Sequence, residues 1–247
     1  MSDDPKERFS DRADDYARYR PSYPDEIIAA ILEGYTSPLV ADLGAGTGIS
    51  AELLARAGAR VFAVEPNASM RRMIAPLPAI TPVAGTAEAT TLPDDSADVV
   101  TAFQAYHWFE PDRVLVEARR ILRPRGRFAA VWNHRDRSDP FTGAYEHIVD
   151  RFDESGGDID RTRRLSTVMG DLRRHGWRNV RTVTASFRQG LDWETLIGRA
   201  RSASYLPKNG APYESMEREL RRLFETWGGE IAFTYVTQAF VAEAPLE

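Results

Sequence analysis

Hydrophobic positions along the chain form short continuous runs that alternate with stripes at helical spacing. The clearest case lies within residues 39–65, where an apolar run ending at Asp42 is followed by a glycine-rich turn. Apolar residues then recur at helical spacing over 49–57, and a second apolar run covers 61–64. This order of strand, turn, helix and strand is typical of one half of a nucleotide-binding α/β unit.

The alternation continues on both sides of this unit. Helices are expected over about 25–32, after Asn67 (with Met70, Met73 and Ile74 facing inward), around 114–122, within 140–175, and in two pieces within 192–227. Further strands are expected at 80–84, at 97–104, in a segment ending near Trp132, at 180–187 and at 231–241. We therefore predict an α/β fold, a Rossmann-like seven-stranded, mostly parallel sheet with helices on both faces and a helical cap.

The length of 247 residues favours one domain over two with separate cores. Within a single domain at 1–247 we expect an N-terminal lid segment at 1–24, a cofactor-binding core at 36–132, and a helical cap inserted at 190–228 before the last strand. The lid could equally be a simple packing arm.

Composition narrows the functional classes. The net charge of −5 argues against general nucleic-acid binding, and the arginines within 119–127 are expected on the solvent face and end of a helix. Cysteine is absent, which removes disulfides and thiolate metal sites, and we expect no metal. No apolar run is long enough for a membrane span and the polar N-terminus is unlike a signal peptide, so a cytoplasmic protein is expected.

The glycine turn carries the first chemical signal. Gly44 and Gly46 begin a G-x-G pattern, but Ile49 stands where a dinucleotide site has its third glycine. Asp42, just before the turn, would repel a pyrophosphate and attract a ligand that carries an ammonium and a sulfonium. Glu65 lies where such folds place the acid that holds ribose hydroxyls. S-adenosylmethionine combines these features.

Four motifs occur in the order seen in a known family. Along the chain they are F-x₆-Y-x₂-Y-R-P-x-Y-P from Phe9, D-L-G-A-G-T-G with Glu65, G-T-A-E at 85–88, and L-R-P-x-G-x-F at 122–128. Over residues 5–132 the chain resembles class I S-adenosylmethionine-dependent methyltransferases, in particular the small-molecule group that includes trans-aconitate and ubiquinone/menaquinone-type enzymes. It departs from the family pattern at Thr86, where many relatives have an acid, and at Arg125, where glycine is usual.

The resemblance implies an antiparallel last strand, S-adenosylmethionine as cofactor and S-adenosylhomocysteine as product. The cofactor-binding residues expected on this basis are Tyr16, Arg20, Asp42, Gly44, Gly46, Glu65, Pro66, Thr86, Ala87 and Gln104. In this assignment Tyr16 and Arg20 face the methionine end.

The acceptor is expected to be a small organic molecule, methylated on oxygen mainly by in-line positioning, with a carboxylate or acidic hydroxyl favoured. Candidate substrate residues are Tyr19, Tyr106, Trp108, Trp132, Arg135, Arg199 and Tyr205; Arg201 is a further arginine near the expected pocket mouth. His107 and His134 follow core strands and are candidate general bases, but hydrogen-bonded shaping of the pocket is the favoured interpretation for each.

Two other functions share the predicted fold. A nicotinamide-dependent oxidoreductase would need the missing glycine spacing, and a non-catalytic nucleotide-binding module would need no acceptor pocket. The sequence leaves open the oligomeric state and the identity of the acceptor.

Overall fold

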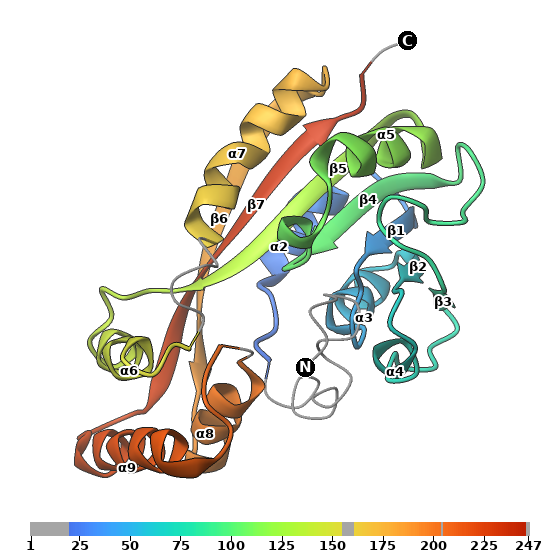
Figure 1. Cartoon of the computed structure of the whole chain (residues 1–247). Coiled ribbons are helices and arrows are strands. Elements are labelled where there is room, and N and C mark those ends of the chain that lie inside the picture. Colours follow the sequence, from blue (N-terminus) through green and yellow to red (C-terminus); the bar gives the residue numbers. More distant parts are fainter. Residues whose placement is uncertain (1–19, 155–160, 204, 246–247) are drawn as a thin grey trace.

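A computed structural model describes residues 20–154, 161–203 and 205–245 of the chain. Its centre is a seven-stranded sheet with the order β3-β2-β1-β4-β5-β7-β6 (Figure 1). The strands are β1 (Leu39–Leu43), β2 (Arg60–Val64), β3 (Ile80–Val83), β4 (Ala97–Phe103), β5 (Leu122–Arg135), β6 (Arg178–Gly190) and β7 (Ala232–Glu243).

The first five strands are parallel to one another, and β7 runs antiparallel to both β5 and β6. The order reverses direction at β1 and β4, so the carboxyl ends of these two strands flank the crevice where ligands bind in open α/β sheets. The predicted fold class, including the antiparallel last strand, is confirmed.

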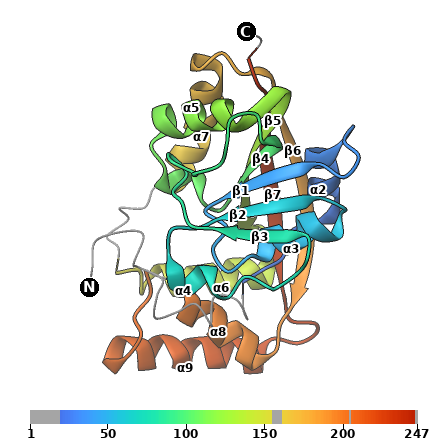
Figure 2. The same ribbon diagram turned by 90° about the vertical axis from the view of Figure 1, so that its right-hand side faces the viewer.

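Helices cover both faces of the sheet and one of its ends (Figures 1 and 2). Their bounds are α2 (Asp25–Leu32), α3 (Ile49–Arg56), α4 (Ala68–Arg71), α5 (Pro111–Ile121), α6 (Pro140–Asp150), α7 (Arg161–Arg174), α8 (Trp193–Ser202) and α9 (Gly210–Thr226), with a short 3₁₀ helix, η2 (Tyr106–Trp108).

Three clusters of buried apolar side chains hold these layers together. The helices α2 and α3 pack on one face of the sheet, and α5 and α7 pack on the other. The third cluster joins α6, α8 and α9 to the first residues of β7, around Phe233 and Tyr235. This end cluster places α8 beyond the carboxyl ends of the parallel strands.

Several local expectations were wrong. The motif at 122–128 forms the start of β5, and β5 extends past the expected end near Trp132 because its residues up to Arg135 pair with β7. Arg125 has a φ of +64°, a left-handed conformation that glycine adopts without strain, at the position where the family usually has glycine. The helix after Asn67 has only four residues, and Met73 is 39% exposed instead of buried.

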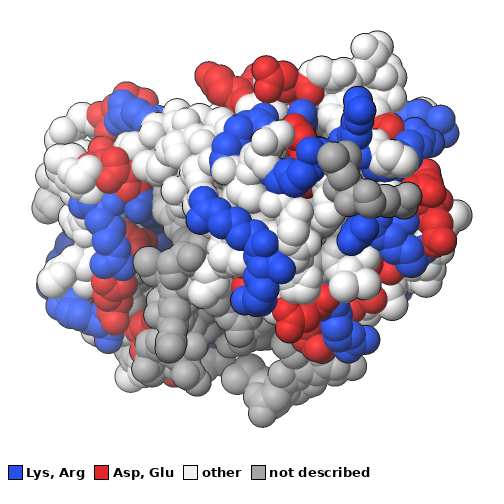
Figure 3. Space-filling model, turned by 90° about the horizontal axis from the view of Figure 1, so that it is seen from above, with Lys and Arg blue, Asp and Glu red and all other residues white. Residues whose placement is uncertain are grey.

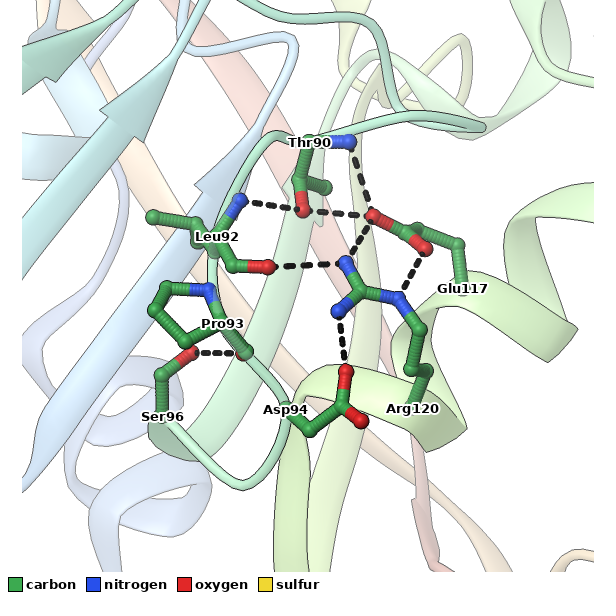
Figure 4. Close-up of polar contacts among 7 residues, drawn as sticks. All are labelled: Thr90, Leu92, Pro93, Asp94, Ser96, Glu117 and Arg120. Carbon is green, nitrogen blue, oxygen red and sulfur yellow. Dashed lines mark hydrogen bonds and ion pairs between the residues drawn. The ribbon is translucent and has the colours of Figure 1, made fainter.

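A partly buried ion pair fixes the loop before β4 to α5 (Figure 4). The carboxylate of Glu117 accepts hydrogen bonds from both the N–H and the hydroxyl of Thr90, at 2.8 and 2.6 Å, and from Arg120. Arg120 also donates to Asp94 and to the carbonyl of Leu92. Arg120 is therefore a structural clamp, and the expectation that it only decorates a solvent face was wrong.

The surface carries charges of both signs. Acidic and basic side chains are interspersed on the face shown in Figure 3. Within the described ranges, the helices are all too short or too polar to cross a membrane.

Candidate active site

The glycine turn between β1 and α3 is held tightly against the end of β4. Gly44 has a φ of +67° and its N–H donates to the carbonyl of Val64 at 2.9 Å. A Cβ on Gly44 would lie 2.8 Å from the Cβ of Ala105. Gly44 therefore has two reasons to be glycine, its backbone conformation and the closeness of the segment after β4.

Glu65 connects this turn to the end of β2. One carboxylate oxygen accepts a hydrogen bond of 2.9 Å from the N–H of Gly46, and the other accepts 2.8 Å from the N–H of Asn67. Burial raises the pKa of Glu65, although both N–H groups act in the opposite direction. Each oxygen keeps a further lone pair, so the carboxylate can hold the turn and still accept from a ligand hydroxyl.

Asp42 faces inward, away from the site. It is fully buried and accepts hydrogen bonds from the hydroxyls of Ser50, at 2.6 Å, and Thr101, at 2.8 Å. Burial raises its pKa to about 6. Asp42 is not among the described residues that line the cavity, so the structure does not support a direct contact with a ligand.

A cavity of about 670 Å³ opens beside the glycine turn. It is lined by most of the residues that the sequence analysis selected from distant parts of the chain: Arg20, Gly44, Gly46, Glu65, Pro66, Thr86, Ala87, Gln104, His107, Trp108, Trp132, His134, Arg135, Arg199 and Tyr205. The volume is within the range of small-molecule sites, roughly 300–1,000 Å³.

Gln104 and His107 form the part of the wall that follows β4. Gln104 has a φ of +51°, and its side chain donates to the carbonyl of Asn133 at 2.9 Å. The indole N–H of Trp132 donates to Nδ1 of His107 at 3.3 Å. A neutral His107 in this hydrogen bond carries its proton on Nε2, so it is a donor there and not a base.

The far end of the cavity contains two buried arginines. Arg135, on β5, forms an ion pair with Glu146 and lies over the rings of Tyr145 and Phe233, at 4.8 and 5.2 Å. Arg199, on α8, is 4% exposed, and its Nε and Nη1 have no hydrogen-bond partner among the described residues. Burial lowers the pKa of Arg199.

The N-terminal segment meets α8 above this cavity. Nη2 of Arg20 donates to the carbonyl of Ser202 at 3.5 Å, and the carbonyl of Ser22 accepts from Asn133 at 2.9 Å. Tyr23 packs edge-on against Phe103 at the end of β4. Segments from opposite ends of the chain thus line one site.

Some candidates lie elsewhere. Tyr106 is 3% exposed, packs in the core between β5 and α7 with its hydroxyl 3.5 Å from Asp171, and is not one of the cavity-lining residues. Arg201 is exposed and donates to the hydroxyl of Tyr213 at 2.8 Å. Tyr16 and Tyr19 lie outside the described residues.

Further lining residues were not selected as site candidates from the sequence, among them Tyr23, Glu146 and Tyr235. Tyr235 is the most informative of these because it pairs with Arg135 across the β5–β7 ladder. Phe233 and Tyr235 are large side chains two residues apart at the start of the last strand. This spacing predicts that they share one face of the strand, but it does not predict which element covers that face.

Residues 41–130 match the family model described as "Methyltransferase domain". Over this segment the chain is similar to methyltransferase domains. The matched segment includes the glycine turn, Glu65, Thr86 and Gln104, which are the residues at one end of the cavity.

Proteins whose names describe them as methyltransferases resemble the chain to different extents. An uncharacterized methyltransferase of Mycobacterium tuberculosis is 45% identical over 122 residues, which are 49% of this chain and 50% of the relative, so the match spans about half of that protein. An uncharacterized methyltransferase-like protein of Schizosaccharomyces pombe is 28% identical over 93% of this chain and 92% of its own. In fold, a putative type II methyltransferase from Anaeromyxobacter dehalogenans has a TM-score of 0.65 at 24% identity, covering 93% of this chain and all of the other.

The methyltransferase domain match ends before the arginine-rich end of the cavity. Arg135, Arg199 and Tyr235 all lie beyond residue 130. The part of the site that the family model describes is therefore the part beside the glycine turn, and the opposite wall is built by residues outside the matched segment.

Proposed function

We propose that the protein transfers a methyl group from S-adenosylmethionine to a small organic acceptor, on oxygen, with a carboxylate or an acidic hydroxyl favoured. The observation that carries this proposal is that one cavity is lined both by the glycine turn with Glu65 and by Arg135 and Arg199. It offers room for a cofactor and an acceptor side by side.

In this proposal the cofactor lies along the carboxyl ends of β1 and β2. Glu65 accepts from the ribose hydroxyls, Gly44 and Gly46 allow the backbone to approach the ligand, and Pro66 lies beside the ribose. Thr86 and Ala87 contact the adenine, Arg20 binds the methionine carboxylate, and Gln104 lines the reacting end. All of these residues line the cavity, which supports the assignment.

The arrangement around His107 favours an acceptor that needs no general base. With Nδ1 occupied by the indole N–H of Trp132, Nε2 bears the proton of the neutral ring. His107 would then orient the acceptor by donating a hydrogen bond. A carboxylate is already a nucleophile, and positioning it in line with the S–CH₃ bond is the main contribution required.

The size and lining of the cavity favour a small acceptor over a protein or nucleic acid. Trp108 and Tyr205 supply aromatic surface for an apolar or flat body, and the arginines suit an anionic group. His134 lines the same cavity and would contribute to its shape. The negative net charge of the chain also disfavours a nucleic-acid substrate.

Two measurements test the proposal against its rivals. Calorimetry should show binding of S-adenosylhomocysteine, and a nicotinamide dinucleotide should bind at least 100-fold more weakly; the reverse order would favour an oxidoreductase. Incubation with S-adenosylmethionine and a panel of small carboxylic acids and phenols should release S-adenosylhomocysteine. Methyl transfer to tRNA or to a protein side chain, with the small acids ignored, would contradict the acceptor class.

A further inference from the structure

We infer that Arg199 and Tyr235 form a carboxylate anchor for the acceptor, at a place separate from the oxygen that receives the methyl group. This inference rests on the proposed function and adds a requirement to it. The acceptor has two functional groups, an anion held at the far end of the cavity and a nucleophile beside the cofactor.

The first observation is a group of buried donors without acceptors. Nε and Nη1 of Arg199 are buried and have no hydrogen-bond partner in the described part of the chain, and the same holds for the hydroxyl of Tyr145. Arg199 and Tyr235 both line the cavity, at 4% and 2% exposure. Leaving such groups unpaired is costly, so a ligand that pairs them binds with a large gain.

The second observation is the charge around Arg199. Burial lowers the pKa of Arg199, the phenol of Tyr235 acts in the opposite direction, and the guanidiniums of Arg20 and Arg135 lower the pKa further. The acidic residues on this side are already engaged, since Glu146 pairs with Arg135 and Arg137, and Asp150 pairs with Arg137. Asp153 also lines the cavity, but it is not among the groups that act most strongly on Arg199.

The phenol of Tyr235 responds to the same excess of positive charge. Burial would raise the pKa of Tyr235, but Arg199 and Arg135 outweigh this effect and lower it. The ring is fixed in place by stacking on Phe187, with centroids 5.1 Å apart and planes 15° from parallel. A carboxylate here would have two oxygens to accept hydrogen bonds, one from the guanidinium and one from the phenol.

The third observation is the distance from the cofactor end. Phe103, the last residue of β4, pairs with Val131, and β5 continues for four more residues to Arg135, which pairs with Tyr235. Four residues of strand span about 13 Å. The methyl donor must approach its nucleophile to about 3–3.5 Å. The backbone of Arg135 and Tyr235 thus lies beyond the end of β4, and an acceptor whose carboxylate is held there would present a second group to the methyl donor.

The test uses the full chain saturated with S-adenosylhomocysteine and titrated with succinate, glutarate and adipate, and with the diamide of each acid. At least one acid should raise the melting temperature and bind, and its diamide should bind at least tenfold more weakly. Arg199→Gln should weaken binding of that acid about 10- to 100-fold, as expected for loss of hydrogen bonds to a charged group. Tyr235→Phe should weaken it by a smaller factor, while Arg201→Gln, a change two residues away on the exposed side of α8, should bind it as the wild type does.

The affinity for S-adenosylhomocysteine separates this inference from the proposed function. It should stay within twofold of the wild type in Arg199→Gln and Tyr235→Phe, which also shows that these variants fold. A large loss in Arg199→Gln would instead assign Arg199 to the cofactor's carboxylate and overturn the anchor. Unchanged acid binding in both variants, or no binding of any of the acids to the wild type, would also overturn the anchor. A wild type that binds no S-adenosylhomocysteine would instead contradict the proposed function.

Discussion

The hydroxyl of Ser50, in the first turn of α3, donates a hydrogen bond of 2.6 Å to the carboxylate of Asp42 at the end of β1. Thr101, on β4, donates to the other oxygen of the same carboxylate. Asp42 thus ties together the two strands and the helix that carry the glycine turn. Its role in the site is to fix the position of that turn.

This burial predicts an unusual pH dependence of stability. The pKa of Asp42 is about 6 in the folded protein and near 3.8 in the unfolded chain. Between these pH values the folded state therefore retains a proton that the unfolded chain has lost. The contribution of Asp42 to the free energy of unfolding consequently falls as the pH rises from about 4 to 6. Relative to Asp42→Asn, the wild type should lose roughly 3 kcal/mol across this window. Urea unfolding of both proteins at pH 4, 5, 6 and 7 measures the difference, and a difference that does not vary with pH would contradict the prediction.

Glu65 is expected to have two functions that one substitution removes together. Glu65→Ala should weaken binding of S-adenosylhomocysteine by roughly 1.5–3 kcal/mol, because a charge-assisted hydrogen bond to the ribose is lost. It should also lower the stability of the ligand-free protein, since the N–H groups of Gly46 and Asn67 lose their acceptors.

Calorimetry and thermal unfolding of the same preparations measure both effects of the Glu65 change. Glu52→Ala is the matched control because Glu52 lies on α3 and forms an ion pair with the exposed Arg56. That variant should leave both quantities nearly unchanged. An affinity of Glu65→Ala equal to the wild type would remove Glu65 from the cofactor site.

The ion pair of Glu117 and Arg120 is expected to contribute more stability than the surface pairs. Burial would raise the pKa of Glu117, but hydrogen bonds from Arg120 and Thr90 lower it to about 2. A carboxyl with a lowered folded pKa stabilises the protein above its unfolded pKa, near 4.5, and that contribution is lost as the pH falls toward 2. Glu117→Gln should therefore reduce the free energy of unfolding by roughly 1.5–3 kcal/mol at pH 7 and by less at pH 3.

Glu230→Gln is the control for this change, because Glu230 forms an exposed pair with Arg188. Exposed pairs contribute about 0–1 kcal/mol, so Glu230→Gln should lie close to the wild type at both pH values. Urea unfolding gives the comparison. Equal losses in the two variants would show that the Thr90–Glu117–Arg120 contacts in Figure 4 add nothing beyond a surface pair.

The hydrogen bond from Trp132 predicts how the reaction depends on His107. With a carboxylate acceptor, His107→Ala should keep the turnover number within roughly tenfold of the wild type, because no proton has to be removed. With a hydroxyl acceptor that needs His107 as its base, the loss should reach about 10²-fold or more. Steady-state release of S-adenosylhomocysteine distinguishes the two, and His147→Ala, an exposed histidine on α6, is the control for loss of an imidazole.

The sequence by itself determined the local structure, that is, the turns, helices and strands whose formation depends on residues close together in the chain. The spacing of Gly44 and Gly46 between an apolar run and a helical stripe predicts a strand–turn–helix unit, since the conformation of such a turn depends on the absence of a Cβ. Periodicity of two or near 3.6 likewise predicts strands and helices, and their alternation predicts the fold class. Glu65 could be selected because it follows a strand at a fixed distance from the turn, and the structure places it at the cavity.

Only the tertiary structure decided which way several side chains face and what covers them. Asp42 carries the charge expected of a ligand contact, but β4 and α3 enclose it and their hydroxyls satisfy it. Arg199 and Arg201 are the same residue type two positions apart on one helix, yet one is buried in the cavity and the other is exposed. Tyr235 acquires its importance from pairing with Arg135, about a hundred residues earlier in the chain. These outcomes depend on the register of antiparallel strands and on how α8 packs at the end of the sheet, and neither is encoded in the local pattern of apolar and polar positions.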